Sequence, residues 1–195
     1  MTYRRKDAFY RRARAAGYRA RSAYKLAELN DRFHLLRRGD RVADLGAWPG
    51  GWLQVALEQV GPEGKVVGID LAPIDPLPNA FLLTGDIRDP AIIETAVTRL
   101  GSKADVVLSD LAPKLTGVRA TDEARSAELV EATLGALPIL LRPGGRLLAK
   151  LFMSAGYLEA VSALRSTFTE VRTTRPQATR QGSSELYVCG LGYRS

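Results

Sequence analysis

Short apolar runs typical of buried strands alternate along most of the chain with segments whose apolar residues recur at helical spacing. The expected helices cover residues 20–33, 53–60, 91–100, 122–141 and 157–166. The expected strands cover residues 41–45, 65–69, 81–83, 104–108, 146–152, 170–174 and 185–191. This alternation predicts an α/β fold with a mostly parallel sheet and helices on both faces. No helix separates the last two strands, so we expect them to form an antiparallel pair at one end of the sheet.

Charged residues stand at or just past the ends of successive expected strands. They are Asp44, Asp70, Asp86, Asp110 and Lys150. In open parallel sheets, ligands bind beyond the carboxyl ends of the strands. A lysine inside a buried strand is also unusual, which sets Lys150 apart from the four acids. The pattern predicts a functional site at this edge of the sheet.

A glycine-rich turn with the sequence DLGAWPGGW follows the first strand and covers residues 44–52. Glycines allow a sharp turn and a close approach of the backbone to a ligand. The turn lacks the G-x-G-x-x-G pattern of dinucleotide-binding proteins, and the chain has no phosphate-binding G-K-[ST]. A nucleoside without phosphate therefore fits better than NAD. The residues that shape this loop are Asp44, Gly46, Pro49, Gly50 and Gly51.

Two further acids complete a candidate cofactor site. Asp70 ends the second strand, where a carboxylate can accept hydrogen bonds from both hydroxyls of a ribose. Asp86 follows the third strand and is placed to read an adenine amino group. Each feature alone also fits an ordinary packing turn. Their order at successive strand ends favours a bound nucleoside.

The net charge of +7 is concentrated in residues 1–21, which we treat as a basic arm preceding a single domain over residues 22–195. The rest of the chain carries equal numbers of acidic and basic side chains. Aromatic residues interleave with the basic ones, as in segments that stack on bases. The arm fits either contact with RNA or a solvated tail. Its candidate RNA-binding residues are Arg4, Arg5, Lys6, Arg11, Arg12, Arg14, Arg19 and Arg21.

Five segments resemble the FtsJ-like (RrmJ) family of ribose 2′-O-methyltransferases. They are SAYKLAE at 22–28, DLGAWPGGW at 44–52, SDLAP at 109–113, GGRLLAKLF at 144–152 and RQGSSELYV at 180–188. The resemblance implies a Rossmann-like class I methyltransferase sheet of seven strands and S-adenosyl-L-methionine as methyl donor. It also implies that the glycine loop with Gly50, Trp52, Asp70, Asp86 and Asp110 line the donor pocket. The implied substrate is a uridine of 23S ribosomal RNA in the large (50S) subunit.

The same resemblance implies that Lys25, Asp110, Lys150 and Glu185 form the reactive cluster. A ribose hydroxyl must lose its proton to become a good nucleophile, and Lys150 is the candidate acceptor. Lysine is ordinarily a poor base at neutral pH, because its usual pKa is ~10.4. Lys25 and burial favour the neutral amine of Lys150, whereas Asp110 and Glu185 favour the ammonium. Lys150 therefore acts either as a base or as a cation that stabilises the developing alkoxide.

Three residues depart from the familiar family pattern: Trp48 in the glycine loop, Lys114 after Ala-Pro and Met153 after Leu-Phe. Trp48 is expected to narrow or cap the donor pocket, and Lys114 adds charge near the RNA face. The sole histidine, His34, and the sole cysteine, Cys189, predict no metal site. We expect His34 in a turn or at the surface and Cys189 in the core.

Alternatives within and outside the class remain. A transfer-RNA 2′-O-methyltransferase would share the four reactive residues, although a chain ending at Ser195 favours the ribosomal type. A noncatalytic RNA-binding protein on the same scaffold would lack one of the four, and all are present. The chain has no apolar run long enough for a membrane and no secretory signal. We expect a cytoplasmic protein with no obligate protein partner.

Overall fold

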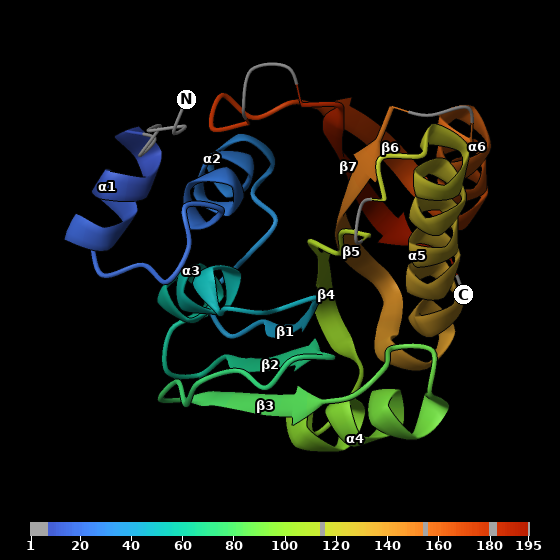
Figure 1. Ribbon diagram of the computed structural model, residues 1–195. Coiled ribbons are helices and arrows are strands. Elements are labelled where there is room, and N and C mark those ends of the chain that lie inside the picture. Colours follow the sequence, from blue (N-terminus) through green and yellow to red (C-terminus); the bar gives the residue numbers. More distant parts are fainter. Residues whose placement is uncertain (1–7, 114–115, 154–155, 180–182, 195) are drawn as a thin grey trace.

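The computed structural model describes residues 8–113, 116–153, 156–179 and 183–194. The described strands form one sheet in the order β3-β2-β1-β4-β5-β7-β6 (Figure 1). The strands are β1 (Arg41–Leu45), β2 (Lys65–Asp70), β3 (Ala80–Thr84), β4 (Ala104–Ser109), β5 (Leu141–Phe152), β6 (Phe168–Thr174) and β7 (Glu185–Tyr193). The helices are α1 (Ala8–Ala15), α2 (Ala23–Phe33), α3 (Gly51–Val60), α4 (Pro90–Leu100), α5 (Arg119–Leu140) and α6 (Tyr157–Thr167).

The predicted parallel sheet with an antiparallel element near its C-terminal end is confirmed. Strands β1 to β5 pair in parallel, and β7 pairs antiparallel with β6. The structure adds a detail that the strand pattern left open, because β7 also pairs antiparallel with β5. Strand β7 therefore lies inside the sheet and β6 forms the edge.

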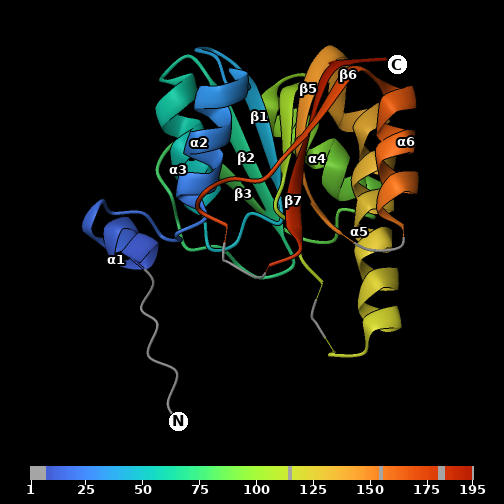
Figure 2. The same ribbon diagram turned by 90° about the horizontal axis from the view of Figure 1, so that it is seen from above.

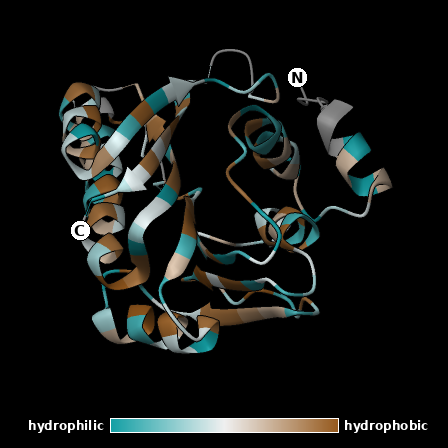
Figure 3. Ribbon diagram, turned by 180° about the vertical axis from the view of Figure 1, so that it is seen from behind, coloured by the Kyte–Doolittle hydropathy of each residue, from teal (hydrophilic) through white to brown (hydrophobic). Residues whose placement is uncertain are grey.

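Helices cover both faces of the sheet, as the alternating pattern predicts. Helices α2 and α3 lie on one face, whereas α5 and α6 lie on the other (Figure 2). Most strand residues alternate between the two cores: in β5, Leu148 packs with α2 and α3, and Leu147 packs with α4 to α6. The helices carry apolar and polar stripes, seen as alternating brown and teal segments in Figure 3, as expected when only one side of a helix is buried.

Each expected helix and strand is present, with ends that shift by a few residues. Helix α1 is the element that the sequence pattern missed, because its basic surface reads as a solvated tail. The helix is nonetheless attached to the body. Its Ala13 side chain is buried, and the guanidinium of Arg12 lies 5.0 Å from the centroid of the Tyr24 ring in α2. In the ranges that the structure describes, no helix has both the length and the apolar character required to cross a bilayer.

Candidate active site

Strand order places three of the chemistry-bearing segments next to one another. Strands β4, β5 and β7 are neighbours, and Asp110 follows directly after β4. Lys150 of β5 lies opposite Tyr187 of β7 in the register, and Glu185 lies two residues earlier on the same strand. Side chains two residues apart project from the same face of a strand, so Glu185 and Tyr187 share a face.

The structure brings the four predicted reactive residues together as two ion pairs. The Lys150 Nζ atom lies 2.7 Å from the main-chain oxygen of Asp110 and 3.1 Å from its Oδ1. The Lys25 Nζ atom of α2 lies 2.7 Å from Glu185 Oε2. Both lysine side chains are nearly enclosed, with 6% exposure for Lys25 and 5% for Lys150. Buried charges of this kind are stable only when they are paired and hydrogen-bonded.

Tyr187 joins the two ion pairs, and no role was assigned to it from the sequence. Its hydroxyl donates to Asp110 Oδ1 at 3.0 Å and lies 3.4 Å from Lys25 Nζ. The side chain is fully buried. Burial, with the charges of Asp110 and Glu185, holds the pKa of Tyr187 well above its usual value, so the hydroxyl stays protonated and can donate. Its spacing of two from Glu185 in a strand is the signal that places it at the site.

Charge pairing keeps Glu185 ionised. Burial opposes ionisation of this carboxyl, but the hydrogen bond and charge of Lys25 outweigh it, with further help from Lys150 and Arg21. The pKa of Glu185 therefore lies below its ordinary value. The cluster thus presents a fixed arrangement of two cations, two carboxyl groups and one phenol.

The glycine loop after β1 adopts conformations that require its glycines. Gly46 has φ +79°, and a Cβ there would lie 2.8 Å from the Leu111 side chain, just beyond Asp110. Gly50 has φ +108° and caps the start of α3. Trp52 follows in the first turn of α3, where its ring is buried, packs 5.9 Å from the Tyr187 ring and donates to the carbonyl of Ser22. The loop therefore contacts the strand end that carries Asp110, and Trp52 reaches the segment leading into α2.

Asp44 is the most unusual residue on the cofactor side. Its side chain is fully buried, and neither carboxyl oxygen has a hydrogen-bond partner among the described residues. Burial, together with the charges of Asp110 and Asp70, holds the pKa of Asp44 well above its usual value. A buried carboxyl without a partner in the protein is satisfied by a ligand, an ion or an ordered water. The amino group of a methionine-derived donor is such a partner, so the residues present fit S-adenosylmethionine.

Asp70 ends β2 and Asp86 follows β3. The two carboxylates differ in the hydrogen bonds that their oxygens accept. Asp70 accepts one backbone N–H on each oxygen, from Trp48 at 2.9 Å and from Ala72 at 2.8 Å. Each oxygen keeps a lone pair for a ribose hydroxyl. Asp86 is held by the backbone N–H and the guanidinium of Arg88, which lower its pKa. An adenine amino group at Asp86 would therefore share the carboxylate with Arg88.

The predicted RNA-binding arginines fall into distinct environments. Arg11, Arg12 and Arg14 are exposed on α1. Arg19 is partly buried and donates to main-chain carbonyls of the body, and Arg21 is close enough to influence the pKa values of Glu185 and Tyr187 electrostatically. The remaining predicted contacts lie outside the described residues: Arg4, Arg5 and Lys6, together with Lys114.

Four other singled-out residues have clear positions. Trp48 is 59% exposed at the glycine loop, and Met153 is 63% exposed just after β5. His34 ends α2 in the left-handed conformation with φ +51°. Cys189 is buried, and burial raises the pKa of its thiol to about 12, which makes it a core residue and a poor nucleophile. The described residues contain no cluster of metal-binding side chains.

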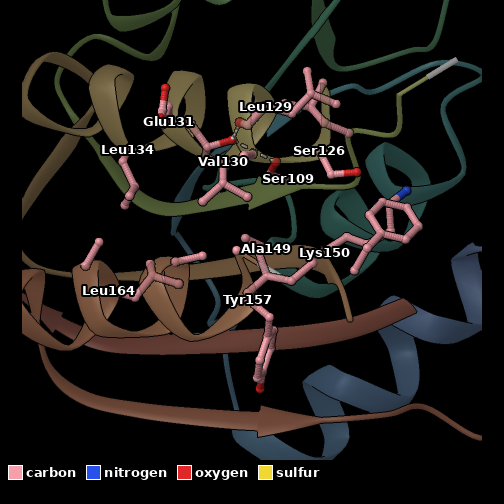
Figure 4. Close-up of a pocket in the computed structure, with 18 of the residues that line it drawn as sticks. Ser109, Ser126, Leu129, Val130, Glu131, Leu134, Ala149, Lys150, Tyr157 and Leu164 are labelled. Atoms are coloured by element: carbon pink, nitrogen blue, oxygen red, sulfur yellow. Dashed lines mark hydrogen bonds between the residues drawn. The ribbon is translucent and has the colours of Figure 1, made fainter. Parts of the chain in front are cut away.

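A cavity of about 270 Å³ lies between α5 and α6 and is mostly apolar (Figure 4). Val130, Leu134 and Leu164 line it, and Ser109 and Lys150 form part of its wall. Its lining includes none of the cofactor-side acids. The four predicted reactive residues gather instead in the charged cluster beyond β4 and β5, with Lys150 belonging to both the cluster and the cavity wall.

This fold and this site together define a Rossmann-like methyltransferase: a parallel sheet with β7 inserted antiparallel, a glycine loop without a dinucleotide pattern, and a lysine–carboxylate cluster beyond β4 and β5. The chain belongs to the FtsJ-like methyltransferase family, whose model matches residues 18–193.

Named relatives of similar sequence are also methyltransferases. The chain is 47% identical over 190 residues to a protein of Methanothrix thermoacetophila, covering 97% of this chain and 74% of the relative. It is 42% identical over 193 residues to one of Methanothermobacter thermautotrophicus, covering 98% and 92%. Both relatives are named Ribosomal RNA large subunit methyltransferase E.

Solved structures show the same fold. A ribosomal RNA methyltransferase structure from Plasmodium falciparum matches with a TM-score of 0.82 and 28% identity, covering 90% of this chain and 98% of that one. Aeropyrum pernix fibrillarin with natively bound S-adenosyl-L-methionine matches with a TM-score of 0.62. At 18% identity over 87% of this chain and 76% of the other, that likeness concerns the fold alone.

Proposed function

We propose that this protein transfers a methyl group from S-adenosyl-L-methionine to a ribose 2′-hydroxyl of RNA, at a uridine of 23S ribosomal RNA in the large subunit. The continuous cluster of Lys25, Glu185, Tyr187, Asp110 and Lys150 carries this proposal. The names of the ribosomal relatives support the substrate, and they favour ribosomal over transfer RNA. Such a substrate implies a cytoplasmic location.

The donor supplies an activated methyl group bound to a sulfonium. Asp44 offers buried oxygens to its amino group, Asp70 offers lone pairs to its ribose hydroxyls, and Asp86 lies where adenine would be read. The glycine loop and Trp52 complete this side. The cluster of charged residues lies next to it, since the pKa of Asp44 is influenced by Asp110.

Lys150 is the proposed proton acceptor. An ammonium has three N–H donors, and Asp110 occupies two of them through its carbonyl and its carboxylate. One direction remains for the substrate oxygen, either as the lone pair of a neutral amine or as an N–H that stabilises the alkoxide. Lys25 and Glu185 neutralise each other, and Tyr187 fixes Asp110. The cluster therefore orients Lys150 for one hydroxyl.

Labelled S-adenosylmethionine tests the proposal directly. The protein is incubated with large ribosomal subunits, naked 23S RNA or transfer RNA, and the product is mapped by mass spectrometry of its nucleosides. We expect ribose-methylated uridine from ribosomal RNA and no label on bases. Methylation of a base would refute the ribose assignment, and a preference for transfer RNA would refute the ribosomal one.

A further inference from the structure

Arg19 was expected to contact RNA, but its guanidinium is bound to the body of the protein. Nη1 donates to the carbonyl of Asp75 at 2.8 Å and lies 3.4 Å from that of Pro49, while Nη2 donates to Pro76 at 2.7 Å. Pro49 belongs to the glycine loop after β1. Residues 75–76 belong to the segment 71–79 after β2. One guanidinium therefore connects the two segments that flank the candidate donor site.

A second residue, Asp70, also links the glycine loop to the segment 71–79. Asp70 accepts the backbone N–H of Trp48 from the glycine loop and of Ala72 from the segment 71–79. Arg19 and Asp70 therefore tie the same two segments at different points. Segment 71–79 contains three prolines, which donate no backbone hydrogen bond, and it forms no regular secondary structure. Contacts from outside the segment must therefore hold it in place.

Arg19 is itself fixed on α3. Its backbone N–H donates to Gln54 Oε1 at 2.8 Å, and Gln54 Nε2 donates to the carbonyl of Gly17 at 2.9 Å. The glycine loop is shaped to receive the side chain, because a Cβ at Gly50 would lie 3.0 Å from Arg19 Nη1. The guanidinium is thus placed by the backbone on one side and by carbonyl oxygens on the other.

We propose that Arg19 is a positioning residue for donor binding, which holds the glycine loop and the segment 71–79 at the separation that S-adenosylmethionine requires. This inference rests on the proposed use of that donor. The planar fork of arginine can reach several carbonyl oxygens at once, whereas the compact ammonium of lysine cannot span them. The geometry of the side chain should therefore matter more than its charge.

The test measures S-adenosylhomocysteine binding by calorimetry without RNA, alongside donor KM and kcat. Arg19→Ala should raise Kd about tenfold, a change of ~1.4 kcal/mol. Arg19→Lys should weaken binding several-fold, and Arg19→Ala should leave the salt dependence of RNA binding unchanged, because the guanidinium is bound to the body. Both variants should raise donor KM with little change in kcat at saturating donor, whereas a general loss of folded protein would lower kcat alone. Arg165→Ala, at an exposed position of α6, is the charge-matched control and should bind normally.

The outcomes separate the two proposals. Wild-type protein that fails to bind S-adenosylhomocysteine overturns the proposed function. If wild-type protein binds S-adenosylhomocysteine and both Arg19→Lys and Arg19→Ala bind it as tightly as wild type, only the role of Arg19 is overturned. A loss of RNA affinity and a flatter salt dependence in Arg19→Ala, with an unchanged Kd for S-adenosylhomocysteine, would show that Arg19 contacts RNA phosphates and does not position the donor.

Discussion

At the scale of single residues, Lys150 and Asp44 are both buried ionisable groups, but only Lys150 has hydrogen-bond partners among the described residues. The Lys150 amine contacts two oxygens of Asp110, which directly follows β4, and the cluster leaves one direction of the amine for a substrate. Asp44 has no partner within the described residues and is held in a medium that disfavours its charge. Polar groups that are buried without complete satisfaction concentrate at functional sites. Each residue therefore gives a prediction of its own.

Lys150→Ala should reduce the single-turnover methylation rate roughly 10²- to 10⁴-fold, the usual contribution of acid–base catalysis. Calorimetric affinity for S-adenosylhomocysteine should stay within about twofold of wild type, because the amine is not itself a proposed donor contact and Asp110 keeps its hydrogen bond from Tyr187. Lys150→Met, which keeps most of the volume, guards against loss of folding. Lys65→Ala, exposed at the start of β2, should have wild-type activity. Near-normal turnover by Lys150→Ala would exclude a role in proton transfer.

Asp44→Asn should stabilise the donor-free protein while weakening donor binding. An acid whose pKa is raised on folding contributes stability below its unfolded pKa of about 4 and loses it as pH rises through the folded value. Asparagine does not ionise, so the variant does not lose stability in this way. The difference in Tm between Asp44→Asn and wild type should therefore grow from about pH 4 upward and then level off. An advantage of roughly 2–4 °C corresponds to about 1 kcal/mol for a chain of this size. Thermal unfolding across pH checks this, and a Tm difference independent of pH would contradict it.

At the scale of elements, helix α2 reaches the site because the segment before β7 holds it. Glu28 accepts the backbone N–H of Gln177 at 2.9 Å, and Arg32 donates to Thr174 at 2.6 Å. Lys25 lies almost one turn before Glu28 on the same helix and meets Glu185 at the start of β7. The helix and the strand therefore carry the ion pair, and contacts outside the site set their separation.

Glu28→Ala should lower kcat several-fold through displacement of Lys25, with an unchanged Kd for S-adenosylhomocysteine. The reason is that α2 loses its anchor at residues 177–178, whereas the donor side is untouched. Glu28→Gln keeps one acceptor oxygen and should show a smaller effect. Asp31→Ala, exposed on the same helix, is the control. If kcat is normal in Glu28→Ala, the anchor has no part in positioning Lys25.

At the scale of the whole molecule, the basic arm and the body are joined more closely than the charge distribution suggests. Residues 17–22 pack along α3, with the Tyr18 hydroxyl on Glu58 at 2.7 Å and Ser22 accepting from Trp52. Helix α1 precedes them and presents its arginines to solvent. The arginines of α1 are therefore exposed for contact with RNA, whereas residues 17–22 belong structurally to the body.

Removal of residues 1–15 should weaken RNA binding and flatten its dependence on salt, because fewer counterions are released when fewer phosphates are neutralised. Affinity for S-adenosylhomocysteine should be unchanged, since Arg19 and Gln54 keep their contacts. Filter binding across 50–200 mM salt measures the slope. Replacing Arg11, Arg12 and Arg14 with glutamine should reproduce part of the effect without shortening the chain. A slope equal to that of the intact protein would show that the arm makes no phosphate contacts.

Local pattern alone determined the α/β class, the position of nearly every strand and helix, and the acids at the strand ends, because periodicity and turn residues act over a few neighbours. The resemblance of short segments added Lys25 and Glu185. Only tertiary structure decided that β7 inserts between β5 and β6, which places Tyr187 opposite Lys150. It also decided that Arg19 turns toward the body. Strand pairing and side-chain burial depend on contacts between residues far apart in the chain, and these have no local signature.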